Sequence, residues 1–309
     1  MRSAATTASN DRRPPCAAWF GLGAALLGGA LLLGGCTPDA SGGLFIDRDV
    51  AGAAHVDVAG GQPLDANGSG GLSGQWAMVA EWSTCVTVGS EFETRAWRLL
   101  KVKAEHTQNR FRETRTLCQL RLSPILGLAT VVPQPLIDGH PVMVVDSLML
   151  GGEAAGAVYL GGFEVQRFGI ELVDLLGETM PAKSATDDPR IIDAENDGKP
   201  GATFHVGSSC DVHVAQREVS ALSGVLGADG RIEGGGVHTI EQVVFSSSKA
   251  ICGQPFSTRP NDAHNRLVMV RSEAFDDDGD GDVSCAELGA HGDAIWKMSE
   301  ADDTRCATK

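Results

Sequence analysis

Alternating apolar and polar positions dominate the chain from Gly74 onward. The first strong run, GQWAMVAEW, carries apolar side chains at every second position: Trp76, Met78, Ala80 and Trp82. In an extended strand, successive side chains point to opposite faces, so these four share one face. Leu100, Val102 and Ala104 alternate with charged residues in the same way. Both runs therefore predict strands with one buried face.

Two hairpins are indicated by turn residues between such runs. Thr114, Thr116, Cys118, Leu120 and Leu122 alternate with Glu113, Arg115, Gln119 and Arg121, and Leu117 is the exception. The segment HTQNR separates this run from the one before it, and its Gln108-Asn109 suits a turn. Asp229-Gly230 marks a second predicted hairpin.

The remaining strand predictions spread along the chain to residue 271. They are PVMVVDSLML, GAVYLGGF, VQRFGIELV, ATFHVG, DVHVAQREVSAL, GVHTIEQVVFSSS and RLVMVR. Long runs with the helical period of 3.6 are scarce by comparison. The pattern predicts an antiparallel all-β domain, built either as a barrel or as a sandwich.

The N-terminus carries an export signal. Arg2, Arg12 and Arg13 precede a charge-free apolar run, which ends in Leu33-Gly34-Gly35-Cys36. This tetrapeptide resembles the lipobox of bacterial lipoproteins. The resemblance implies cleavage before Cys36, attachment of a diacylglycerol to its sulfur and acylation of the new amino group. An ordinary membrane-spanning anchor is the alternative, since the apolar run is near the short limit for a spanning helix.

A segment rich in Gly, Ala, Asp and Ser follows from Thr37 to Leu72 and is typical of a flexible tether. With it, the chain resembles exported bacterial lipoproteins that combine a Gly-rich tether, a β-rich body and Asp/Gly loops. Thr37 rather than Asp follows the cysteine. By the sorting pattern of such lipoproteins, this implies the outer membrane, facing the periplasm or the cell surface.

The start of the β body resembles lipocalins in one short motif. Gly74-Gln75-Trp76 matches the G-x-W that opens their first strand. The resemblance implies that Trp76 closes the floor of a barrel beneath an arginine of the last strand, either Arg266 or Arg271. It also implies an apolar cavity able to hold a small ligand.

Charge and cysteine content restrict the partners and the compartment. The formal net charge of −15 argues against binding to nucleic acid or to an anionic membrane surface. Six cysteines remain after the lipidated one, and an even number in an exported protein predicts disulfides. They are Cys85, Cys118, Cys210, Cys252, Cys285 and Cys306. We expect the pairs Cys85–Cys118, Cys210–Cys252 and Cys285–Cys306, among fifteen possible arrangements.

An acidic stretch near the C-terminus has the spacing of a calcium loop. A Ca²⁺ loop of the EF-hand type needs oxygen ligands at positions 1, 3, 5, 7, 9 and 12, with glycine at position 6. The residues in register are Asp276, Asp278, Asp280, Asp282 through its carbonyl, Ser284 and Glu287. Gly281 stands at position 6, Val283 supplies the apolar position 8, and Phe275 precedes the loop. The stretch resembles the EF-hand superfamily, although the preceding RLVMVRS predicts a strand rather than a helix.

A second acidic loop is a weaker metal candidate. Asp193, Glu195 and Asp197 alternate before Gly198, with the carbonyl of Lys199 at the seventh place. Phe204 stands at the twelfth place, where a bidentate carboxylate is needed. An Asx-rich turn between strands is the alternative.

Four familiar motifs are missing from the chain after Cys36: the G-x-S-x-G elbow of hydrolases, the H-E-x-x-H of metalloproteases, the P-loop and the Rossmann fingerprint. The predicted organisation is a signal peptide over 1–35, a tether over 36–72, an antiparallel β domain over 73–272 and a calcium loop with a C-terminal helix and tail over 273–309. We expect a lipid-anchored, calcium-binding envelope protein that is non-catalytic and binds a small apolar ligand or an envelope protein. The alternative is an envelope hydrolase of glycan or lipid that uses acidic residues as general acid and base.

Overall fold

A computed structural model describes residues 71–125, 127–250, 252, 257–300 and 306. The predicted signal peptide, Cys36 and nearly all of the predicted tether lie outside these residues. The described elements are β1 (Gly74–Val88), β2 (Ser90–Thr107), β3 (Arg110–Leu122), β4 (Thr130–Val131), α1 (Gln134–Asp138), β5 (Met143–Leu150), β6 (Val158–Leu160), β7 (Glu164–Phe168), β8 (Ala202–Val206), β9 (Cys210–Leu226), β10 (Ile232–Ser247), β11 (Ser257–Pro260), β12 (Arg266–Arg271) and α2 (Cys285–Ile295). Two 3₁₀ turns, Asp262–His264 and Glu273–Phe275, flank β12.

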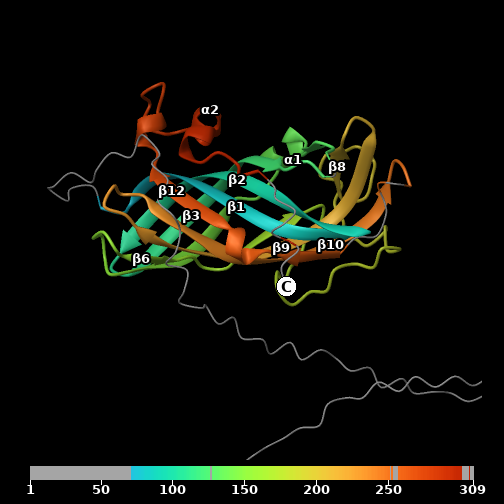
Figure 1. Ribbon diagram of the computed structural model, residues 1–309, viewed down its shortest axis with the longest axis horizontal. Coiled ribbons are helices and arrows are strands. Elements are labelled where there is room, and N and C mark those ends of the chain that lie inside the picture. The colour runs from blue at the N-terminus through green and yellow to red at the C-terminus, as the bar shows by residue number, and fades with distance from the viewer. Residues whose placement is uncertain (1–70, 126, 251, 253–256, 301–305, 307–309) are drawn as a thin grey trace, which may run out of the picture. The chain divides into compact units, whose positions relative to one another are not determined.

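The twelve described strands form one antiparallel sheet (Figure 1). Neighbouring strands run in the order β10-β12-β1-β2-β3-β5-β6-β9, and β9 also pairs directly with β10. The pairings therefore return to their starting strand. β7 and β8 pair with β9, β4 pairs with β8, and β11 pairs with β1. The predicted antiparallel β architecture is confirmed, together with a C-terminal helix.

Both predicted hairpin turns are present. β2 and β3 are joined at Gln108-Asn109, and Gln108 adopts a positive φ of 58°. β9 and β10 are joined at Asp229-Gly230, where the glycine has a φ of 78°. The second turn thus has glycine at its positive φ, whereas in the first turn the positive φ falls on Gln108 rather than on the asparagine that follows.

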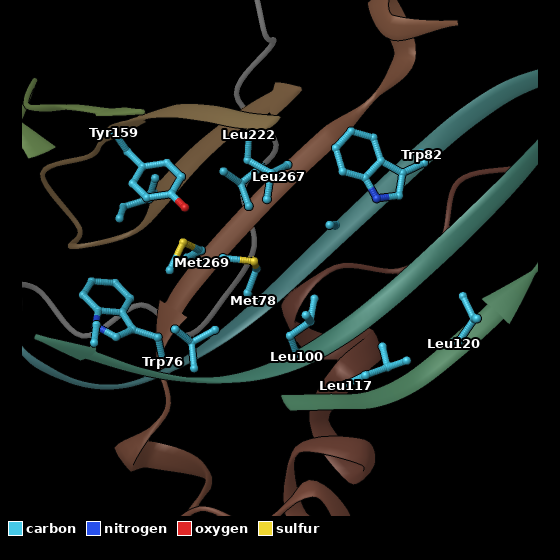
Figure 2. Close-up of a cluster of buried hydrophobic side chains, with 14 of the residues drawn as sticks. Trp76, Met78, Trp82, Leu100, Leu117, Leu120, Tyr159, Leu222, Leu267 and Met269 are labelled. Atoms are coloured by element: carbon cyan, nitrogen blue, oxygen red, sulfur yellow. The ribbon is translucent and has the colours of Figure 1, made fainter. Parts of the chain in front are cut away.

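One side of the sheet encloses the main apolar cluster. Trp76, Met78, Ala80 and Trp82 all belong to it, as the alternation in β1 predicted. Figure 2 shows their neighbours pointing toward one another from β2, β3, β6, β9 and β12: Leu100, Leu117, Leu120, Tyr159, Leu222, Leu267 and Met269. Full burial of each large apolar side chain stabilises the fold by roughly 1.5–3 kcal/mol.

The alternating run predicted from Thr114 to Leu122 does not keep one face in the structure. Glu113, Arg115 and Leu117 are buried, whereas Thr114 is exposed. The cause is a register shift between β2 and β3: Leu99 pairs with Gln119, but the next residue, Leu100, pairs with Leu117. An extra residue in one strand moves later side chains to the other face, which also explains why Leu117 broke the pattern.

The opposite side of the same strands is covered by α2 (Figure 1). Val283, Leu288 and Ile295 pack there against a second apolar cluster that includes Val79, Trp97, Leu99 and Val268. Gly292 allows this approach, because a Cβ atom there would lie 2.9 Å from the ring of Trp97. The predicted C-terminal helix is confirmed, and it ends at Ile295.

Three disulfides connect the described chain: Cys85–Cys306, Cys118–Cys285 and Cys210–Cys252. The expected pairs Cys85–Cys118 and Cys285–Cys306 are wrong, and Cys210–Cys252 is confirmed. Cys85 and Cys118 lie on strands that both pair with β2 and are separated by it. Instead, Cys285 at the start of α2 is bound to Cys118 on β3, and Cys306 is bound to Cys85 on β1. Disulfides of this kind indicate a non-cytoplasmic location.

Candidate functional site

The acidic loop brings three carboxylates of the predicted calcium set together. Ligand oxygens of Asp276, Asp278 and Glu287 all lie within 4.8 Å of one another, a separation that one metal ion could bridge. This is the one group of three such residues among the described parts of the chain. Gly281 has a φ of 87°, as the sharp turn at position 6 requires.

Hydrogen bonds from the backbone hold the loop in this shape. Asp276 accepts from the amides of Gly279 and Gly281 at 2.8 and 2.9 Å. Glu287 forms a capping box with Ser284 at the start of α2 and also accepts from the amide of Asp277 at 2.8 Å. These bonds, the one from Ser284 above all, lower the pKa of Glu287 to about 2. The carboxylate that would bind a cation is therefore ionised at neutral pH.

The loop is attached to the sheet by one glutamine. The side-chain amide of Gln75 on β1 donates to the carbonyl of Gly281 at 2.8 Å and accepts from the amide of Val283 at 3.1 Å. Val283 itself is buried. Gln75 thus binds the backbone on both sides of Asp282, and the position-8 side chain inserts into the second apolar cluster.

The side chain of Asp282 lies outside the carboxylate cluster of Asp276, Asp278 and Glu287. It forms ion pairs with Lys101 and Lys103 of β2 at 2.9 and 3.0 Å, and both lysines lower the pKa of its carboxyl. This arrangement fits the expectation that Asp282 offers a metal only its carbonyl. The structure further shows Asp280 accepting from the amide of Asp282 at 2.7 Å.

The second acidic loop is held by hydrogen bonds of its own. Asp193 accepts from the amides of Asp197 and Gly198, and Asp197 accepts from the amide of Lys199 and the hydroxyl of Thr203. Glu195 accepts from the amide of Thr203 at 3.0 Å. Burial raises the pKa of the Glu195 carboxyl. These contacts describe an Asx-type turn leading into β8.

An apolar cavity of about 360 Å³ lies toward the ends of β1 and β3 and the start of β2. Its apolar walls come from six strands and include Val86, Leu120, Phe168, Phe204, Val212 and Ile240. The size is within the range of small-molecule sites, about 300–1,000 Å³. Sequence reasoning implied an apolar cavity but could not place it.

The other end of β1 is filled. Trp76 is 1% exposed, and the guanidinium carbon of Arg271, its register partner on β12, lies 4.7 Å from the centroid of its ring. The indole nitrogen of Trp76 donates to the carbonyl of Leu72 at 3.0 Å. Of the two arginines named from the sequence, Arg271 therefore makes the contact; Arg266 donates to the carbonyl of Asn265.

Charged side chains lie between the filled end and the cavity, which the sequence pattern did not predict. Arg98 of β2 and Glu218 of β9 are each 2% exposed and form an ion pair. Arg115 binds Glu113, Glu164 and the hydroxyl of Tyr159. Alternation in a strand places every second residue inside the β body. From sequence alone, a charged residue at such a position is assigned to the solvent-facing side, because the buried partner that neutralises it cannot be identified.

Comparisons with protein-family models, curated proteins and solved structures find no match to this chain. Neither described α-helix could span a membrane, since α1 has 5 residues and α2 has 11.

Proposed function

We propose that the protein is a lipid-anchored, calcium-binding protein of the cell envelope whose β body is a barrel that binds a small apolar ligand. The apolar cavity carries this proposal, because its walls combine β1, β2, β3, β9 and β10 of the circuit of pairings with β7 and β8, which pair with β9. A circuit that closes through β9 and β10 supports a barrel over a sandwich, which would keep two separate sheets. The contact of Trp76 with Arg271 supports the lipocalin-like closure of one end.

Binding is favoured over hydrolysis by the charges in the cavity. A glycosidase-type mechanism needs two facing carboxylates, but Glu218 is the single carboxylate among the described lining residues, and it is paired with Arg98.

A neutral apolar fluorophore, N-phenyl-1-naphthylamine, is expected to bind the purified protein with one site per chain. Val212 is half-buried and lines the cavity, so Val212→Trp should fill the space and weaken binding at least about tenfold. Val144→Trp on the exposed side of β5 is the matched control and should bind as the wild type does. Fluorescence titration gives both constants. Equal binding by the two variants would show that the fluorophore occupies another surface.

Calcium is the metal proposed for the acidic loop, since its ligands are hard oxygens in a loop with EF-hand spacing. Sites of this kind outside cells have dissociation constants of about 10⁻⁴–10⁻³ M. Glu287→Gln should raise the constant about tenfold or more, because it removes charge from a carboxylate of the cluster. Asp282→Ala should change it less, because that side chain faces Lys101 and Lys103. Titration calorimetry at millimolar calcium measures both, and equal weakening would refute the ligand assignment.

Lipid attachment at Cys36 is proposed from the lipobox-like sequence. Cys36→Ala is expected to abolish incorporation of labelled fatty acid in a bacterial host. Cys16→Ala, which removes a cysteine ahead of the cleavage position, is the control and should leave labelling intact. Labelling that persists without Cys36 would contradict the proposal.

A further inference from the structure

The apolar cavity is also lined by charged residues, which lie outside the acidic loop. Arg98 and Glu218 line it and reach across the interior from β2 and β9, strands that are not neighbours in the sheet. Arg95 also lines it, but its guanidinium is bound to Glu81 and Glu93. Arg98 and Glu218 are thus the charged lining residues that could contact a ligand.

Part of this pair lacks hydrogen-bond partners. One Arg98 nitrogen, Nη2, donates to Oε2 of Glu218. Nε and Nη1 of Arg98 and Oε1 of Glu218 are shielded from solvent and have no partner within the described chain. Unpaired buried polar atoms are costly, and those in native proteins are usually paired with ordered water or a ligand. Arg98 and Glu218, which both line the cavity, therefore hold donor and acceptor atoms without partners in the described chain.

The neighbouring charges restrict what can complete the pair. Arg115, Glu113 and Glu164 are buried nearby, and the Coulombic influence of Arg98 extends to Glu164. Together with Arg98 and Glu218 they comprise two positive and three negative groups. An added anion would face the Glu218 carboxylate and increase the negative excess, whereas an added cation would reduce the excess but face the Arg98 guanidinium. An uncharged group that both accepts and donates hydrogen bonds matches Arg98 and Glu218 together.

His140 adds no positive charge to this region. It packs against Phe168, a lining residue, with ring centroids 5.3 Å apart and ring planes inclined at 51°. Burial, and then the nearby Arg98, lower the pKa of His140 to about 4, so the ring is neutral at pH 7.

We propose that the cavity takes a small amphipathic molecule whose uncharged head group, a hydroxyl or a primary amide, lies between Arg98 and Glu218 with its apolar chain against the cavity walls. This inference rests on the proposed ligand-binding function and names the class of ligand. The head accepts a hydrogen bond from the guanidinium and donates one to the free oxygen of Glu218.

A series with one chain length tests the inference: octane, octanol, octanamide, octanoate and octylammonium, each competing with N-phenyl-1-naphthylamine at pH 7. Octanol and octanamide should bind roughly tenfold or more tightly than octane, as expected for hydrogen bonds to charged groups. Octanoate and octylammonium should bind more weakly than the two neutral polar ligands. If affinity follows apolar area alone, or if octanoate binds best, the head-group inference is overturned.

Arg98→Met/Glu218→Met removes both charges together, so that neither is left buried alone. This variant should still bind the fluorophore but lose the preference for octanol over octane. A retained preference would place the head group elsewhere. If the double variant does not fold, the series on the unaltered protein decides. Failure of the fluorophore to bind the unaltered protein would refute the ligand-binding function itself, whereas binding without head-group preference refutes only the present inference.

Discussion

Arg115→Met is expected to lower the free energy of unfolding by about 3–5 kcal/mol, the range for removing one partner of a buried ionic network. Arg115 is 1% exposed and binds Glu113 at 3.0 Å and the hydroxyl of Tyr159 at 2.7 Å, besides its ion pair with Glu164. Methionine would leave two carboxylates buried without this countercharge. Urea unfolding followed by tryptophan fluorescence measures the change.

Arg110→Met is the matched control, on the same strand. Its partner is Asp146, and both side chains are more than half exposed, so the loss should be at most about 1 kcal/mol. Adding Glu113→Gln and Glu164→Gln to Arg115→Met should recover part of the lost stability. A loss in Arg115→Met no larger than in the control would show that the network does not stabilise the fold.

Removal of the Cys118–Cys285 disulfide is the second change expected to have a large effect. Its sequence separation is 167 residues, and it fixes the start of α2 to β3. Cys118→Ala/Cys285→Ala should cost about 2–5 kcal/mol of stability. Because Ser284 and Glu287 at the start of α2 also shape the acidic loop, calcium affinity should fall in the same variant.

Cys210→Ala/Cys252→Ala serves as the comparison. Its separation is 42 residues, and the chain-entropy model assigns the shorter loop about 1 kcal/mol less stabilisation. It lies away from the acidic loop in the chain, so calcium affinity should stay unchanged. Thermal unfolding and calorimetry of both variants separate the two effects. Equal loss of calcium affinity in both would contradict a local role for the Cys118–Cys285 link.

The sequence predicted the parts of the fold in which a local residue pattern is compatible with a single local structure. Alternation identified the face of β1 that joins the main apolar cluster, although Ala77 and Val79 on its other face are buried as well, and Gln108-Asn109 and Asp229-Gly230 marked the two hairpin turns. The spacing from Asp276 to Glu287 predicted a cluster whose members do converge. Each of these signals is local in the chain.

Features that depend on distant residues were not predictable in the same way. The inward position of Arg115 follows from a register shift between β2 and β3, and Arg98 meets Glu218 across 120 residues. The disulfide partners depend on the path of the C-terminal segment over the sheet. Alternation alone treats a charged residue as outward-facing, and spacing alone favours cysteines that are near in sequence.

The disulfide connectivity has a consequence for how the protein matures. Cysteines emerge in chain order during synthesis or export, so Cys85 and Cys118 are the first two thiols of the body able to meet an oxidant. Their native partners, Cys306 and Cys285, follow 221 and 167 residues later. Early oxidation would join the wrong pair, and its correction requires attack by another thiolate through a mixed disulfide. Folding of the protein is therefore expected to require a disulfide isomerase, and not only an oxidant, in the compartment where the protein matures.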